Sequence, residues 1–105
     1  MNLSDLLGRL GRDLHELYGP RYRGLILFGS HARGTADEGS DVNVLLLLDG
    51  PVNFVAELHR IEPITWPLAL EEDLALSVMP ESEQDYLAGD RLFLRLARRE
   101  GIRVA

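Results

Sequence analysis

The residues with the clearest potential for chemistry lie in two short segments, 29–34 and 40–43. The first reads Gly-Ser-His-Ala-Arg-Gly and the second reads Ser-Asp-Val-Asn. A glycine permits a tight turn and a close approach of the backbone, and a helix that begins after such a turn offers free N–H groups to a phosphate. A nearby carboxylate, here Asp41, can hold the magnesium ion that accompanies phosphates. Together the two segments predict a site for a nucleoside triphosphate.

Further polar side chains extend this predicted site. Asp41 and Asn43 are two residues apart on a predicted strand and therefore point to the same side. Asp73, on a later predicted strand, joins them if the two strands are neighbours. Such a cluster is what two-metal phosphoryl transfer requires, because the metal ions hold the phosphates and lower the pKa of the attacking hydroxyl. The alternative for Asp73 is a solvated acidic run over residues 71–73, in which Glu72 is the other candidate ligand.

The combined pattern, Gly-Ser-x-Ala-Arg-Gly followed by Ser-Asp-x-Asn, resembles the minimal nucleotidyltransferases of the DNA polymerase β-like superfamily. The resemblance covers nearly the whole chain. It implies an α/β (α+β) fold, a small mixed sheet flanked by helices, in one domain over residues 1–105. It also implies an enzyme that uses Mg²⁺ at a two-metal site and transfers a nucleotide, AMP from ATP, to a hydroxyl acceptor.

The resemblance assigns roles to individual positions. Asp41 and Asp73 would be the catalytic carboxylates and, with Asn43, the metal ligands. The nucleotide would be bound by Gly29 and Ser30 through the β- and γ-phosphates, by Arg33 near the triphosphate or bracing the loop, and by Ser40 at the start of the strand.

Asn43 is the departure from the family pattern, which has a second aspartate at this position. An amide oxygen can ligate magnesium but brings no negative charge. We therefore expect weaker binding of at least one metal ion and reduced or absent transfer.

Minimal nucleotidyltransferases are often encoded beside a small helical protein of the HEPN class, so the resemblance also implies a partner. In such pairs the HEPN protein is an RNase toxin, neutralised by tight binding or by transfer of AMP to a tyrosine. Three hypotheses follow: an active antitoxin enzyme, an inactive module that neutralises by complex formation, and a small-molecule nucleotidyltransferase. The lack of a second, substrate-binding domain argues against the third. The leading helix, Trp66 and the last helix are candidate contact surfaces.

Composition narrows the class of protein. The chain has 105 residues, 46% hydrophobic and 27% charged, as expected for one globular domain with one modest core. A net charge of −6 argues against general nucleic-acid binding. We find no apolar run near the roughly 18–20 residues of a membrane span and no export signal. The absence of cysteine fits a reducing cytoplasm, where we expect the protein to act.

Periodicity and turn residues predict the elements that position these groups. Leucines at helical spacing indicate a leading helix over residues 3–17, capped by Ser4 or Asn2 and ended by Gly19-Pro20. Pro63 and Pro67 predict a broken connection through Trp66. The other expected elements are strands at 24–28, 41–48, 72–79 (ended by Pro80) and 102–104, a short helix closed by Gly34, and helices at 52–61, after Ser82, and from Asp90 to about Arg99.

Overall fold

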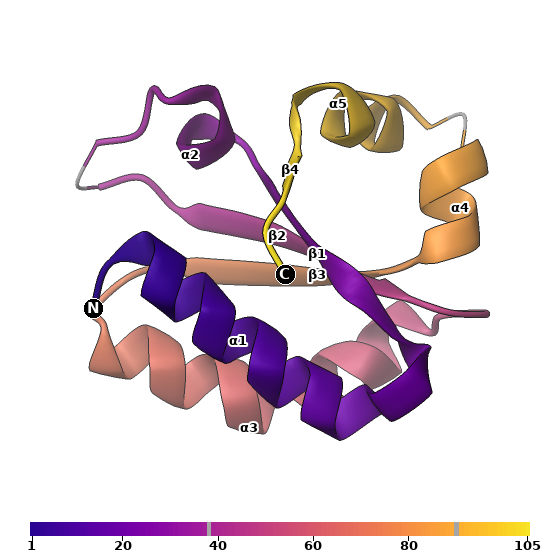
Figure 1. The fold of residues 1–105 in the computed structure, drawn as a ribbon, viewed down its shortest axis with the longest axis horizontal. Coiled ribbons are helices and arrows are strands. Elements are labelled where there is room, and N and C mark those ends of the chain that lie inside the picture. The colour runs from indigo at the N-terminus through magenta and orange to yellow at the C-terminus, as the bar shows by residue number, and fades with distance from the viewer. Residues whose placement is uncertain (38, 90) are drawn as a thin grey trace.

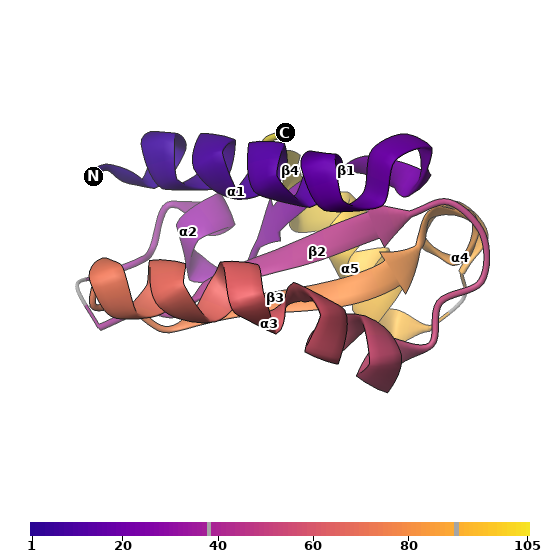
Figure 2. The same ribbon diagram turned by 90° about the horizontal axis from the view of Figure 1, so that it is seen from below.

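The computed structural model describes residues 1–37, 39–89 and 91–105 and contains a four-stranded sheet in the order β3-β2-β1-β4. Helices α1 and α3 lie side by side on one face of the sheet, and α2, α4 and α5 lie on the other (Figure 1; Figure 2). The elements are α1 Leu3–Tyr18, β1 Tyr22–Phe28, α2 Ser30–Arg33, β2 Val42–Leu48, α3 Phe54–Glu71, β3 Leu76–Ser82, α4 Glu83–Ala88, α5 Leu92–Glu100 and β4 Ile102–Arg103.

The sheet is mixed, as predicted. Strand β1 pairs antiparallel with β2 and with β4, whereas β2 and β3 are parallel. Parallel neighbours need a crossover connection, and α3 supplies it between β2 and β3 (Figure 1).

Alternation along β2 divides the core into two layers. Val44, Leu46 and Leu48 pack against α1 and α3, whereas Leu45 and Leu47 pack against α4 and α5. All five side chains are fully buried. The face that carries Leu45 and Leu47 is the face that carries Asn43, because side chains two apart share a side of a strand.

The leading helix begins and ends where the sequence predicts. Asn2 is the N-cap, and its side-chain oxygen accepts a hydrogen bond from the backbone N–H of Asp5 at 2.8 Å. Gly19 ends the helix with φ 57°, a conformation that suits glycine. A short 3₁₀ turn at Gly19–Arg21 leads into β1.

The prediction that the chain breaks around Trp66 is wrong, because α3 runs without interruption through Pro63 and Pro67. Each proline removes one backbone hydrogen bond and costs stability inside a helix. Both prolines are exposed, so water can satisfy the carbonyl groups they leave free. Burial of Ile61 and Leu68 against the sheet holds the helix in place.

The predicted boundaries of the third strand are also wrong, because β3 starts at Leu76 and not at residue 72. Asp73 adopts φ 49°, and its N–H bonds to the Leu70 carbonyl while the Leu74 N–H bonds to the Ala69 carbonyl. These two bonds form the Schellman motif that ends a helix. The acidic run is therefore used to terminate α3.

Pro80 lies within β3 and does not end it. The Val42 N–H donates to the Ala75 carbonyl, so in a parallel ladder the odd-numbered residues of β3 face β2. The nitrogen of Pro80 therefore faces the free edge of the sheet, where a proline removes no ladder hydrogen bond.

Two smaller predictions are confirmed and one lies outside the described residues. Ser82 caps α4 by accepting from the Asp85 N–H at 3.3 Å, and β4 forms the short edge strand. Asp90, the predicted cap of the last helix, lies outside the described residues. Within the described part of the chain, no helix has the length and apolar character to cross a membrane.

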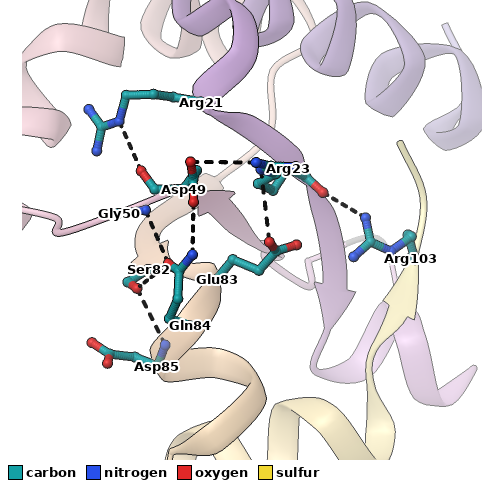
Figure 3. A network of polar contacts seen from close by, with 9 residues as sticks. All are labelled: Arg21, Arg23, Asp49, Gly50, Ser82, Glu83, Gln84, Asp85 and Arg103. Atoms are coloured by element: carbon teal, nitrogen blue, oxygen red, sulfur yellow. Dashed lines mark hydrogen bonds and ion pairs between the residues drawn. The ribbon is translucent and has the colours of Figure 1, made fainter.

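A polar network ties the strand ends opposite Asn43 to the start of α4 (Figure 3). The Asp49 carboxylate accepts from the Gln84 amide at 2.8 Å and lies 3.4 Å from the Arg23 guanidinium. Arg23 also pairs with Glu83 at 3.9 Å, and Arg21 donates to the Asp49 carbonyl at 3.1 Å. The hydrogen bond from Gln84 and the contact with Arg23 lower the pKa of Asp49.

This lowered pKa predicts a dependence of stability on acid. A carboxyl whose folded pKa lies below its unfolded value stabilises the fold above about pH 4 and loses that contribution as the pH falls through the folded pKa. Asp49→Asn and Gln84→Ala should both flatten the loss of stability below about pH 4. Urea unfolding at several pH values measures this, and parallel losses in the wild type and both variants would contradict it.

A second polar contact joins α1 to α3 inside the first layer. The Tyr18 hydroxyl donates to the buried Glu57 carboxylate at 2.8 Å, and Arg60 donates to the same oxygen at 2.9 Å. Burial, and then the hydrogen bond to Glu57, raise the pKa of Tyr18. The buried hydroxyl of Tyr22, by contrast, has no hydrogen-bond partner among the described residues.

The two tyrosines form a matched pair for a stability test. Tyr18→Phe should destabilise the protein by about 1–3 kcal/mol, because it leaves a buried carboxylate without one of its donors. Tyr22→Phe should be neutral or slightly stabilising, because it removes an unpaired buried hydroxyl. Urea unfolding of the two variants decides this, and equal losses would show that the Tyr18–Glu57 contact contributes nothing specific.

Candidate functional site

The site predicted from the sequence is built where β1 ends and β2 begins. Gly29 follows β1 with φ 80°, and a Cβ placed on it would lie 3.1 Å from the Asn43 side-chain nitrogen. A larger residue would therefore be strained and would press on Asn43. The structure brings Gly29, Ser30 and Asn43 together, as the sequence predicts.

The single-turn helix α2 starts at Ser30 and is closed by Gly34 in the left-handed conformation. Its first internal hydrogen bonds run from Ala32 and Arg33 to the Gly29 carbonyl, so the N–H groups of Ser30 and His31 precede the helical bonding pattern. This is the turn that the resemblance assigns to the phosphates.

Arg33 and Ser40 have partners within the protein. Arg33 pairs with Glu100 at the end of α5, with 3.4 Å between Nη1 and Oε2. The Ser40 hydroxyl accepts from the Asp37 N–H at 3.0 Å, and the Ser40 carbonyl lies 3.4 Å from Nε2 of His31. In this arrangement Arg33 braces α2 against α5, and Ser40 shapes the loop before β2. A direct role for either residue in nucleotide binding stays a prediction.

Asp41 is exposed and immediately precedes β2, and Asn43 is partly buried on β2. Asn43 is paired with Phe28 of β1 and with Ser77 of β3. The three side chains therefore form a row across the second face of the sheet. Phe28 packs edge-on against Phe93 of α5, with 5.4 Å between ring centroids, and gives the row an apolar end.

The parallel register of β3 identifies two positions that the sequence analysis missed. Ser77 is the partner of Asn43, and Ala75 immediately precedes Leu76, the partner of Val42. Ala75 and Ser77 are thus the β3 positions beside Asp41 and Asn43. The sequence does contain a signal for Ser77, because Leu-Ser-Val at 76–78 repeats the apolar-polar-apolar pattern of Val-Asn-Val at 42–44.

Asp73 is not on a strand, contrary to the prediction. It lies in the turn after α3 and lines a surface hollow together with Trp66, Leu70 and Leu74. The site residues Gly29, Ser30, Asp41 and Asn43 are not among the described residues that line this hollow. A role for Asp73 as a metal ligand or catalytic carboxylate stays a prediction.

The ligand set beside the Gly29 turn does not fit a two-metal centre. Asp41 provides one carboxylate, Asn43 an amide, Ser77 a hydroxyl and Ala75 no polar side chain. Magnesium at such sites is held by carboxylates, which also neutralise its charge. The described residues contain no group of three or more His, Cys, Asp or Glu side chains able to hold a metal ion.

Comparison with known proteins identifies the family. The family model described as a nucleotidyltransferase domain matches residues 9–97. The chain belongs to this nucleotidyltransferase family. It is 31% identical over 77 residues, 73% of this chain and 77% of the relative, to MJ0141 of Methanocaldococcus jannaschii, a proposed protein adenylyltransferase. MJ0604 of the same organism, also a proposed protein adenylyltransferase, is 30% identical over 84 residues, 80% of this chain and 78% of the relative.

Solved structures with the same fold confirm the polymerase β-like nucleotidyltransferase architecture. A chain from a crystal structure of a toxin–antitoxin with AMP-PNP superposes with a TM-score of 0.68 at 17% identity, covering 99% of this chain and 73% of that one. A chain from a mutant of the toxin–antitoxin MntA–HpeT gives a TM-score of 0.64 at 19% identity, covering 100% and 73%. At these identities the likeness concerns the fold.

The incomplete ligand set predicts a weak response to magnesium. About 10 mM Mg²⁺ should leave the urea midpoint of the wild type unchanged. A site with a dissociation constant of about 0.1 mM would instead raise the free energy of unfolding by about 2.7 kcal/mol and move the midpoint upward. Asn43→Asp alone should add little to the stabilisation by Mg²⁺. Asn43→Asp combined with Ala75→Asp, or with Ser77→Asp, should give a clear stabilisation, because only then do several carboxylates converge.

The control for this measurement is KCl at matched ionic strength. If Mg²⁺ raised the urea midpoint of the wild type as much as that of the double variants, the conclusion that the ligand set does not fit a two-metal centre would be contradicted. Loss of such a response in Asp73→Asn would instead identify Asp73 as a ligand.

Proposed function

We propose that this chain is the antitoxin of a toxin–antitoxin pair and that it neutralises its toxin by forming a complex with it. The observation that carries the proposal is the set of four positions beside the Gly29 turn, 41, 43, 75 and 77, among which Asp41 alone provides a carboxylate. The family's chemistry is nucleotidyl transfer, but the groups that would hold its metal ions are largely replaced. The fold is retained.

The proposal for the partner is supported by the structural neighbours, which are chains from crystal structures of toxin–antitoxin pairs. The resemblance stated above adds the class of partner, a helical HEPN-type RNase toxin.

The nucleotide is proposed to bind without reacting. The Gly29–Ser30 turn, which leads into the single-turn helix α2, supports this proposal, as does a neighbour that was crystallised with AMP-PNP. ATP bound here would lie against the start of α2. Adenylate transfer is not needed for neutralisation in this view.

Transfer of AMP to the toxin is the second candidate, favoured by Asp41 and by the relatives proposed to be protein adenylyltransferases. In that reaction a toxin hydroxyl attacks the α-phosphorus of ATP. A phosphodiester bond forms, the bond to the β-phosphate breaks, pyrophosphate leaves, and the hydroxyl proton passes to a base, for which Asp41 is the candidate at this site. Mg²⁺ would be required at a site with few anionic ligands, so this chain would be a slow enzyme.

The two candidates differ in their response to Asp41→Asn. Co-expression with the product of the adjacent gene should relieve toxicity equally for the wild type and for Asp41→Asn, because complex formation does not use the carboxylate. Incubation of the purified pair with α-labelled ATP and Mg²⁺ should leave no label on the toxin.

Label that appears on the toxin with the wild type and disappears with Asp41→Asn would establish the second candidate. Failure of the wild type to relieve toxicity, with no complex on size-exclusion chromatography, would overturn the proposed function.

A further inference from the structure

We propose that the groove between α3 and β3, here called the α3–β3 groove, docks the toxin through an amphipathic helix with basic residues. This inference rests on the proposed function and names the surface and the chemistry of the partner segment. The groove consists of two adjoining hollows that share Thr65, Trp66 and Leu76.

The groove exposes large apolar side chains that a free monomer would be expected to bury. Trp66 is 65% exposed and Leu70 is 76% exposed, one turn apart on α3. Helix α3 thus has apolar residues on its inner side, such as Ile61, and also on its outer side. Contiguous exposed apolar surface of this kind marks an interaction site, and a central tryptophan is the residue most often found at the energetic centre of an interface.

The charges of the groove indicate a basic partner. The two charged residues among the described lining residues are carboxylates, Glu62 toward the middle of α3 and Asp73 in the turn after it. With a rise of 1.5 Å per residue, Glu62 lies roughly 14 Å along the helix axis from Glu71, the last residue of α3, and Asp73 follows two residues later. A partner with basic side chains about that far apart would meet both, whereas a second copy of this chain, with net charge −6, would bring like charge.

The free edge of β3 argues for a helix as the occupant and against an added strand. Edge strands are templates for strand addition, and Leu76, Val78 and Pro80 present their backbone to this edge by the parallel register. Pro80 has no N–H to donate, so an added strand would lose a ladder bond there. Apolar side chains laid into the groove between α3 and the edge match helix-in-groove recognition.

The groove and the candidate site share strand β3. Ser77 lines the groove and is also the strand partner of Asn43. The side chains of this pair belong to the face of the sheet opposite α3, so a toxin segment seated in the groove would lie across β3 from the Gly29 turn. Helix α5 also exposes Leu92 and Leu96, beside the exposed cations Arg95 and Arg99, and it supplies the matched control.

The first experiment measures toxin affinity for variants in the groove and on α5. Trp66→Ala should weaken binding of the purified toxin by about 30-fold, the effect typical of a central hot spot. Leu92→Ala, which truncates a leucine that is 67% exposed on α5, should bind like the wild type. Circular dichroism and urea unfolding check that both variants keep the fold, as expected for exposed positions.

The second experiment tests the charge of the partner segment. Glu62→Gln with Asp73→Asn should weaken binding several-fold and reduce its dependence on salt, because two attractive charges are lost. Asp13→Asn with Glu16→Gln on α1 makes the same change in net charge away from the groove and should have a smaller effect. Tighter binding by the groove variant would mean that the partner segment is acidic and would overturn the proposal.

The outcomes separate this inference from the proposed function. If the wild type binds the toxin and Trp66→Ala binds equally well, the groove proposal fails and the antitoxin function stands. If Leu92→Ala is the variant that loses affinity, the docking surface is α5 and the groove proposal also fails. If the wild type binds no toxin, the proposed function itself fails.

Discussion

The structure depends on the burial of β2 on both of its faces. Five consecutive residues from Val44 to Leu48 are fully buried, which is possible only when helices cover each side of the sheet. Helices α1 and α3 cover one side, and α4 and α5 cover the other (Figure 1). A strand of this kind fixes its own register, because a shift by one residue would exchange the two apolar layers and bring polar residues at the strand's start into one of them.

The same register determines the chemistry of the site. Asn43 continues the second face of β2 beyond Leu45, where the covering helices end, so its side chain meets the Gly29 turn. The neighbouring strands then supply Phe28 on one side and Ser77 on the other. A metal centre at this turn would draw its ligands from these positions and from Asp41, and the strand pairing leaves few others within reach. Substitution at 43, 75 and 77 therefore changes the charge of the site and leaves the fold intact.

A nucleotidyltransferase fold with such a site remains well suited to binding. The Gly29 turn, the helices around it and the apolar α3–β3 groove do not depend on metal ligands. Tyr18 and Glu57 hold α3 against α1 from the inside, so the outer side of α3 can carry exposed apolar residues without loss of the packed core. Two prolines on the exposed side of α3 and one at the free edge of β3 are compatible with this surface, because each lies where a missing N–H removes no tertiary hydrogen bond.

The sequence by itself determined the family, the mixed α/β class, the Gly29 turn, strands β1 and β2 and the cap at Ser82, because these follow from local turn chemistry and from short motifs. It left the cap of the first helix open between Ser4 and Asn2, and the structure selects Asn2. It also predicted that Asn43 departs from the pattern of the family. It could not determine that α3 continues through two prolines, because burial of Ile61 and Leu68 against the sheet overrides local propensity there. It also could not determine that the exposed Asp73 closes this helix, because that role depends on where the helix ends. Only the tertiary structure placed Ala75 and Ser77 beside Asp41 and Asn43, since the register of two parallel strands joined by an 18-residue helix is set by packing and not by any local signal.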